Sequence, residues 1–202
     1  MMLWKRLIDI IFSLIILIFV FPIVYVICGL IIKITSKGPI IFVQTRVGKD
    51  GKPFRIYKFR TMYLNYDEEH DDDIIPFGHI MRKTHVDEIP QVINVLKNDM
   101  SLVGPRPHTL KDTEDFSMKN DKYNERLAMK PGITGLAQVN GFCGKITNIY
   151  HLDKRIQYDI YYVNNWSLWL DFHILTHTFK HFADPQLDKP IITQWRKQTI
   201  DV

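Results

Sequence analysis

Asp87 and Glu88 are adjacent carboxylates at the start of a segment with helical periodicity. The apolar residues that follow recur at the i, i+3, i+4, i+7 spacing of an amphipathic helix, namely Ile89, Val92, Ile93 and Leu96. Pro90 fits the first turn of such a helix, where a missing amide hydrogen is harmless. Both carboxylates are therefore expected at a helix N-terminus, where acidic side chains are also ordinary partners of the helix dipole.

Cationic side chains suited to phosphate binding accompany this pair. They lie next to turns or at the ends of expected elements: Lys58, Arg60, Arg82, Arg106 and Lys130. Arginine and lysine in such positions bind phosphate oxygens, and a helix N-terminus itself attracts anions. Carboxylates among phosphate-binding cations indicate Mg²⁺, because this ion bridges carboxylate and phosphate oxygens. The pattern predicts phosphoryl chemistry, with Asp87 and Glu88 as catalytic and metal-binding residues.

Common catalytic and nucleotide motifs are absent from the sequence. It contains no G-x-x-x-x-G-K-[ST], G-x-G-x-x-G or H-E-x-x-H motif and no serine elbow. The acidic run from Asp67 to Asp73 is interpreted as a solvated loop, because consecutive side chains point in different directions whereas metal ligands converge. Phosphoryl chemistry therefore has to rest on carboxylates, cations and a metal ion.

Length and charge narrow the class of protein. A chain of 202 residues can form one compact core. Its 26 Lys and Arg against 22 Asp and Glu give a net charge of +4, which suits an anionic substrate or lipid surface but requires neither. The basic residues are dispersed, which disfavours nucleic-acid binding. Cys28 and Cys143 are far apart and indicate no disulfide framework.

The N-terminal segment is expected to enter a membrane. Residues 10–32 form a run of 23 residues without a charged side chain, whereas about 20 suffice for a spanning helix. The run is too long for a secretory signal and lacks a cleavage site. Pro22 near its middle predicts a bend into two halves, each too short to span. Basic residues flank both ends, which favours a re-entrant helix with both ends in the cytoplasm over a kinked spanning helix: Lys5, Arg6, Lys33 and Lys37.

Further elements follow from local patterns. Residues 40–47 and 54–59 read as two strands, joined by a hairpin at Asp50-Gly51. The charged stretch 111–126 predicts an exposed helix. The aromatic residues between 158 and 182 suit either a soluble core or amphipathic helices at a membrane surface.

The predicted fold is mixed α/β, helix-rich with a small β-hairpin. Residues 1–37 form the re-entrant membrane helix and its flanks, and residues 38–202 form a cytoplasmic catalytic domain associated with the membrane surface through amphipathic helices.

A series of motifs from end to end resembles the bacterial sugar transferase family, the monotopic polyprenyl-phosphate phosphoglycosyl transferases that begin capsule, exopolysaccharide, O-antigen and glycoprotein assembly. The motifs are Lys5-Arg6-x-x-Asp9, Gly38-Pro39-Ile40-Ile41-Phe42-Val43-Gln44-x-Arg46-x-Gly48, Lys58-Phe59-Arg60-Thr61-Met62, Asp87-Glu88-Ile89-Pro90-Gln91, Asn94-Val95-Leu96, Asp99-Met100-Ser101-Leu102-Val103-Gly104-Pro105-Arg106-Pro107, Pro131-Gly132-Ile133-Thr134-Gly135-Leu136-Ala137-Gln138-Val139 and Asn165-Trp166-Ser167-Leu168-Trp169-Leu170-Asp171.

The resemblance implies roles for several residues. Asp87 would attack the phosphate that bears the sugar, expel UMP and carry the phospho-sugar until polyprenyl phosphate takes it. Glu88 would position Mg²⁺ or assist in proton and charge handling, and Arg82 would bind phosphate. Pro22 would bend a re-entrant helix. The implied partners are a UDP-sugar, undecaprenyl phosphate and the lipids of the bacterial inner membrane at its cytoplasmic face; the oligomeric state is left open, with a homodimer among the options.

Three positions depart from the family pattern. Phe21 stands before the membrane proline where the family often has Ser. Cys143 follows Gly141 where an arginine is common, with Lys145 as a candidate substitute. His85 replaces a small hydroxyl residue close to Asp87.

The sugar and the reaction have alternatives. Residues 107–114 and 165–171 resemble the glucose- or galactose-phosphate branch, so UDP-glucose or UDP-galactose is expected, with an N-acetylated UDP-sugar as the alternative. A membrane-tethered scaffold without catalysis and a glycosyltransferase that releases UDP are the rival functions.

Overall fold

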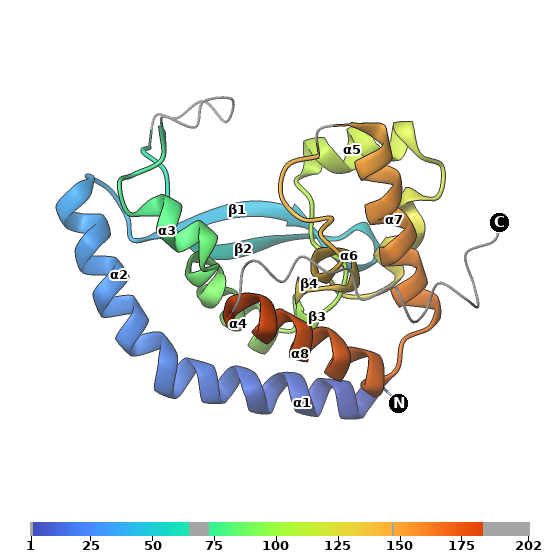
Figure 1. Cartoon of the computed structure of the whole chain (residues 1–202), viewed down its shortest axis with the longest axis horizontal. Helices are drawn as coiled ribbons and strands as arrows, with labels where there is room; N and C mark the ends of the chain where they lie inside the picture. Colours follow the sequence, from blue (N-terminus) through green and yellow to red (C-terminus); the bar gives the residue numbers. More distant parts are fainter. Residues whose placement is uncertain (1, 65–72, 147, 184–202) are drawn as a thin grey trace. The chain divides into compact units, whose positions relative to one another are not determined.

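The computed structural model describes residues 2–64, 73–146 and 148–183 (Figure 1). The chain forms two compact units: unit 1 comprises Met1–Arg46 and Phe54–Met100, and unit 2 comprises Val47–Pro53 and Ser101–Val202. Most of the acidic run, from Asp67 to Asp72, lies outside the described residues, so its interpretation as a solvated loop stays a prediction. The division into 1–37 and 38–202 likewise stays a prediction.

The apolar N-terminal segment of unit 1 is a helix in three parts. Helix α1 (Met2–Ile15) passes through a π-helical turn, η1 (Ile16–Val20), into α2 (Phe21–Thr35). Pro22 lies in the first turn of α2. Because its ring would collide with the carbonyl four residues earlier in a regular α-helix, the wider π turn gives it room. Figure 1 shows α1 and α2 running in different directions on either side of this turn.

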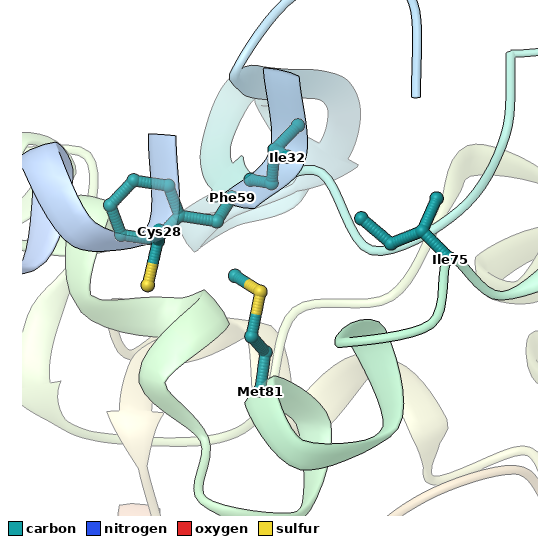
Figure 2. Packing of buried hydrophobic residues seen from close by; sticks show 5 residues of the cluster. All are labelled: Cys28, Ile32, Phe59, Ile75 and Met81. Atoms are coloured by element: carbon teal, nitrogen blue, oxygen red, sulfur yellow. The ribbon is translucent and has the colours of Figure 1, made fainter. Parts of the chain in front are cut away.

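This helix is the membrane candidate of the chain. Among the described residues, Leu3–Thr35 is the one helix with the length and apolar composition needed to cross a bilayer, and length and composition establish no more than that. The side chains that α2 buries, among them Cys28 and Ile32, form a core with Phe59, Ile75 and Met81 of the rest of unit 1 (Figure 2). One face of α2 is thus covered by protein, while Ile23, Val26 and Leu30 remain exposed.

The predicted hairpin is confirmed. Strands β1 (Ile41–Val47) and β2 (Pro53–Phe59) form a two-stranded sheet. Their connection is the short 3-10 turn η2 (Lys49–Gly51), in which Asp50 and Gly51 both have positive φ, 56° and 75°. This conformation is the reason that Asp-Gly is a hairpin signal.

The helix predicted from Asp87 is not one regular helix, and this expectation was wrong in detail. Helix α3 (Gly78–Lys83) precedes a 3-10 segment, η4 (Val86–Gln91), and only then does the α-helix α4 (Val92–Leu96) begin. The amide of Glu88 donates to the carbonyl of His85 at 3.0 Å, the i to i+3 bond of a tighter helix. Pro90 has no amide hydrogen to donate, so a complete series of α-helical hydrogen bonds can begin only after this residue.

Unit 2 is built from a small parallel sheet and several helices. Strand β3 (Ser101–Val103) pairs in parallel with β4 (Gly132–Thr134), with Ser101 opposite Gly132. The remaining elements are α5 (Leu110–Lys119), the 3-10 segment η5 (Tyr123–Ala128), α6 (Leu136–Val139), α7 (Ile149–Asn164) and α8 (Leu168–Ala183). Tyr123, Leu152 and Ile156 form a buried cluster between η5 and α7.

The exposed helix predicted for 111–126 is two elements. The side chain of Asn120 accepts from the amide of Lys122 at 2.9 Å and donates to Asp153 at 2.8 Å. This local bond offers the backbone an alternative to continued helix, so α5 ends at Lys119 and the chain turns before η5.

The two glycine-rich turns of unit 2 cross in close contact. A Cβ atom on Gly132 would collide with the backbone nitrogen of Gly104, and one on Gly135 would collide with the carbonyl oxygen of Gly104. The amide of Gly132 donates to Pro105 at 3.0 Å, and that of Gly104 donates to Thr134 at 2.9 Å. Glycine is therefore required at this crossing, which holds the turns that carry Arg106 and Lys130.

We predict that Gly132→Ala lowers the free energy of unfolding by about 1–3 kcal/mol or more, because the obstructing atoms are backbone and cannot rotate away. Thermal unfolding of the detergent-solubilised full chain, followed by circular dichroism, measures the effect. Lys111→Ala, at an exposed position of α5, is the control. Equal losses in the two variants would contradict the close crossing.

Candidate active site

Asp87 and Glu88 lie in the first turn of η4 and are both buried, with 7% and 5% of their surface exposed. His85, immediately before η4, has the left-handed conformation at φ 51° and ψ 16°. A residue other than glycine in this region costs about 1–3 kcal/mol, which the surrounding contacts must supply. The residue that directly precedes the segment with the two carboxylates thus has a strained backbone conformation.

An ion pair fixes Glu88. The ammonium nitrogen of Lys58, on β2, lies 2.7 Å from Oε1 of Glu88, and little of either side chain is exposed. A buried carboxylate needs such a partner, because its desolvation is otherwise expensive. Lys58, one of the five predicted phosphate-binding cations, is thus held directly against Glu88.

Asn94 sets the register between β2 and α4. It is fully buried; its side-chain oxygen accepts from the amide of Tyr57 at 3.1 Å, and its side-chain nitrogen donates to the carbonyl of Arg55 at 2.7 Å. The amide group thereby bonds to β2 as a neighbouring strand would. Since Lys58 follows Tyr57 directly, this contact places the ammonium group opposite Glu88.

Arg6, near the start of α1, holds the other end of α4. Its two terminal nitrogens donate to the carbonyls of Val95 and Leu96 at 2.6 and 3.0 Å. Carbonyls at the end of a helix have no partner within the helix, and a cation there also opposes the helix dipole. The N-terminal membrane candidate is therefore bonded to the short helix that follows Asp87 and Glu88.

Arg82 and Arg60 have different surroundings. Arg82 is exposed, and its Nε donates to the hydroxyl of Thr61 at 3.0 Å. Arg60 is buried, and its guanidinium donates to the carbonyls of Pro39, Met62 and Ser36 at 2.7, 3.2 and 3.3 Å. Burial lowers the pKa of Arg60 from its usual value. These bonds tie the end of α2 to the end of β2, so phosphate binding by Arg60 stays a prediction that its contacts do not support.

Arg106 and Lys130 belong to unit 2 and lie in its two crossing turns, where both are half-buried. The carbonyl of Arg106 accepts from Arg126 at 2.6 Å. The structure thus holds Lys58 against Glu88 in unit 1, to which Arg60 and Arg82 also belong, and places Arg106 and Lys130 in unit 2.

The donor set for a metal ion is limited to two carboxylates. Within residues 2–64, 73–146 and 148–183, no three His, Cys, Asp or Glu side chains converge. Two carboxylates completed by substrate phosphate oxygens are a usual Mg²⁺ environment, so the residues fit that ion in the presence of substrate rather than as a closed protein site.

Sequence reasoning missed a buried polar network in unit 2. Arg126, 1% exposed, donates through Nε to Asp159 at 2.8 Å. Tyr123 lies beside it and bonds His108 Nδ1 at 2.7 Å, and burial raises the pKa of this tyrosine. These residues come from three segments with no shared motif, so their types alone gave no signal that they meet.

A family model described as bacterial sugar transferase matches residues 1–184. The chain belongs to this family. Members of the bacterial sugar transferase family with curated names include a UDP-glucose:undecaprenyl-phosphate glucose-1-phosphate transferase of Klebsiella pneumoniae, 45% identical over 91% of this chain and 41% of the relative.

Two further relatives show the range of names. A protein of Escherichia coli strain K12 with the same name as the Klebsiella relative is 40% identical over 89% of this chain and 40% of its own length. A UDP-N-acetylgalactosamine-undecaprenyl-phosphate N-acetylgalactosaminephosphotransferase of Aeromonas hydrophila is 39% identical over 75% of this chain and 37% of the relative. The chain spans about two fifths of the length of these relatives.

We predict that Arg6→Lys weakens α4, because one ammonium cannot donate to two carbonyls in the planar geometry of a guanidinium. The loss should be about 1.5–3 kcal/mol, the range for hydrogen bonds to charged groups. Hydrogen exchange of residues 92–97 measures it directly, since local opening of α4 exposes those amides. Lys33→Gln, an exposed cation of α2, is the control. Unchanged exchange in Arg6→Lys would contradict the role of this contact.

Proposed function

We propose that the protein is a polyprenyl-phosphate sugar-1-phosphate transferase that moves a hexose 1-phosphate from a UDP-sugar to undecaprenyl phosphate. The observation that carries the proposal is the buried Asp87-Glu88 pair with Lys58 held 2.7 Å from Glu88, in a chain of the bacterial sugar transferase family. A product of this type would initiate capsule, exopolysaccharide or O-antigen synthesis.

The transfer takes two displacements at one phosphorus atom. A carboxylate oxygen of Asp87 forms a bond to the phosphorus that bears the sugar, and the bond from that phosphorus to the bridging oxygen breaks. UMP leaves with the electron pair. An oxygen of undecaprenyl phosphate then attacks the same phosphorus, the bond to Asp87 breaks, and the carboxylate is regenerated with a lipid diphosphosugar as product.

The neighbouring residues supply positioning and charge. Lys58 holds Glu88 in one orientation, and Arg82, exposed beside Thr61, is suited to a substrate phosphate. Asp87 and Glu88 would hold Mg²⁺ together with phosphate oxygens. The ion, when bound, would reduce the repulsion between an anionic nucleophile and an anionic substrate.

We propose glucose as the sugar that is transferred. The Klebsiella and Escherichia relatives are both named for glucose 1-phosphate transfer, while the more distant Aeromonas protein is named for N-acetylgalactosamine. UDP-glucose therefore comes first in a substrate panel, UDP-galactose second and N-acetylated UDP-sugars third.

Membrane attachment would bring the site to the lipid phosphate. The helix Leu3–Thr35 enters the cytoplasmic face of the bacterial inner membrane and returns, in our proposal, because Pro22 and the π turn bend it. Trp169, Phe172 and Phe179 on α8 are largely exposed at helical spacing, as expected of a helix that lies in the interface.

We predict that Asp87→Asn lowers steady-state release of UMP by roughly 10³-fold or more, the scale for loss of a nucleophile. The assay uses full-length protein in detergent with Mg²⁺, undecaprenyl phosphate and each UDP-sugar. Glu114→Gln removes an exposed carboxylate of α5 and serves as the control. Equal UMP release by Asp87→Asn and wild type would contradict the proposal; release of UDP would indicate glycosyl transfer, and no release from any UDP-sugar would indicate a scaffold.

We predict that both ends of the N-terminal helix face the cytoplasm. Leu3→Cys and Lys52→Cys, each in a Cys143→Ser background, report the two sides; Cys28 is buried and stays in place. A membrane-impermeant maleimide should label both positions in inside-out vesicles and neither in intact spheroplasts. Labelling of the two positions from opposite sides would establish a spanning helix.

A further inference from the structure

Arg155 is a buried arginine of α7 with an incomplete set of partners. It is 3% exposed, its Nη2 donates to the carbonyl of Gly144 at 2.9 Å, and its Nη1 lies 3.4 Å from Nε2 of His108. Its Nε is buried and makes no hydrogen bond within the described residues. Buried donors are almost always paired, so this nitrogen calls for an acceptor.

The charge around Arg155 is out of balance. Arg106 and Arg126 both repel its guanidinium, and Asp159 is the one carboxylate of the described part of the chain that attracts it appreciably. Asp159, however, is already bonded to Arg126, with nitrogens at 2.7 and 2.8 Å from the same oxygen. Arg126 and Arg155 therefore share Asp159, and a buried cation without its own counter-charge is costly.

Burial and the neighbouring charges change the pKa of Arg155. Burial, followed by repulsion from Arg106, lowers the pKa of its guanidinium from the usual value to about 10. Burial and the charge of Arg155 also lower the pKa of His151, one turn earlier on α7. Both shifts have the direction that a bound anion would reverse.

The loop bonded to Arg155 lies at the protein surface. Gly141, Cys143 and Gly144 are exposed, and Arg106 is half-buried. Phe142 packs against His151 and Tyr158 of α7, with ring centroids 5.5 and 5.3 Å away, which fixes the loop beside Arg155. The bond to Gly144 thus places a cation of α7 beside this loop.

We propose that Arg155, together with Arg106, binds a phosphate group. Two guanidiniums can share the several oxygens of a phosphate, and a phosphate oxygen is a suitable acceptor for the buried Nε. The inference that this site binds phosphate is drawn only from residues of unit 2. The identity of the phosphate, which belongs either to the UDP-sugar or to undecaprenyl phosphate, rests on the proposed function.

The test measures anion binding without turnover. The melting temperature of the full-length protein in detergent is recorded against inorganic phosphate and against UMP, at ionic strength held constant with chloride. Arg155→Gln removes the charge, Arg155→Lys keeps a charge but removes Nε, and Arg106→Gln removes the second guanidinium. Lys154→Gln makes the same change of charge at the neighbouring residue, whose ammonium bonds Gln157 at 3.2 Å, and is the control.

Lys154→Gln should bind each anion as tightly as wild type does. Each arginine variant should bind phosphate and UMP at least about tenfold more weakly than wild type. If Arg155→Gln does not fold, Arg155→Lys and Arg106→Gln carry the test. Wild-type affinity in a folded Arg155 variant, or no binding of either anion by wild type, overturns the proposal.

Steady-state constants then distinguish the two sources of phosphate. An increase in KM for the UDP-sugar in Arg155→Lys assigns the nucleotide phosphates, and an increase in KM for undecaprenyl phosphate assigns the lipid. An unchanged KM for both overturns a substrate role. Phosphate binding that depends on Arg155 in a protein that releases no UMP would sink the proposed function and leave the anion site standing.

Discussion

Helix α4 is five residues long, too short to be stable on its own. It depends on contacts from outside: Arg6 donates to its last carbonyls, and Asn94 bonds it to β2. The segment directly before α4 carries Asp87 and Glu88, so the same contacts hold the two carboxylates in place. Arg6 lies near the start of the helix that is the membrane candidate. The helix that would attach the chain to a membrane therefore also helps to hold the two carboxylates in position, within unit 1.

Sequence patterns identified the elements whose signals are local. The hairpin followed from Asp-Gly at Asp50, and the break in the apolar helix followed from Pro22, because each depends on the backbone preferences of a few neighbouring residues. The 3-10 form of η4 was missed, since the helical periodicity after Asp87 outweighed the missing amide of Pro90. The parallel pairing of β3 with β4 was also missed, because it depends on Gly104 meeting Gly132, a contact that periodicity does not encode.

The candidate site shows the same division. The adjacency of Asp87 and Glu88 and their place in a helical first turn were readable from sequence, whereas the partner of each cation was not. Arg60 looks like Arg82 in sequence, yet it is buried against backbone carbonyls while Arg82 is exposed. Arg155 was absent from the prediction, because a lone arginine in an amphipathic helix is ordinarily a solvated residue. Its burial among other arginines makes it notable.

The central claim is that Asp87 becomes covalently attached to the phospho-sugar. Rapid-quench experiments with UDP-glucose and Mg²⁺, without any lipid acceptor, test it most directly when combined with intact-protein mass spectrometry. We expect a burst of UMP equal to the enzyme present and a matching mass increase on the peptide that contains Asp87. UMP that forms only when undecaprenyl phosphate is added, with no adduct on Asp87, would contradict the claim and indicate direct transfer.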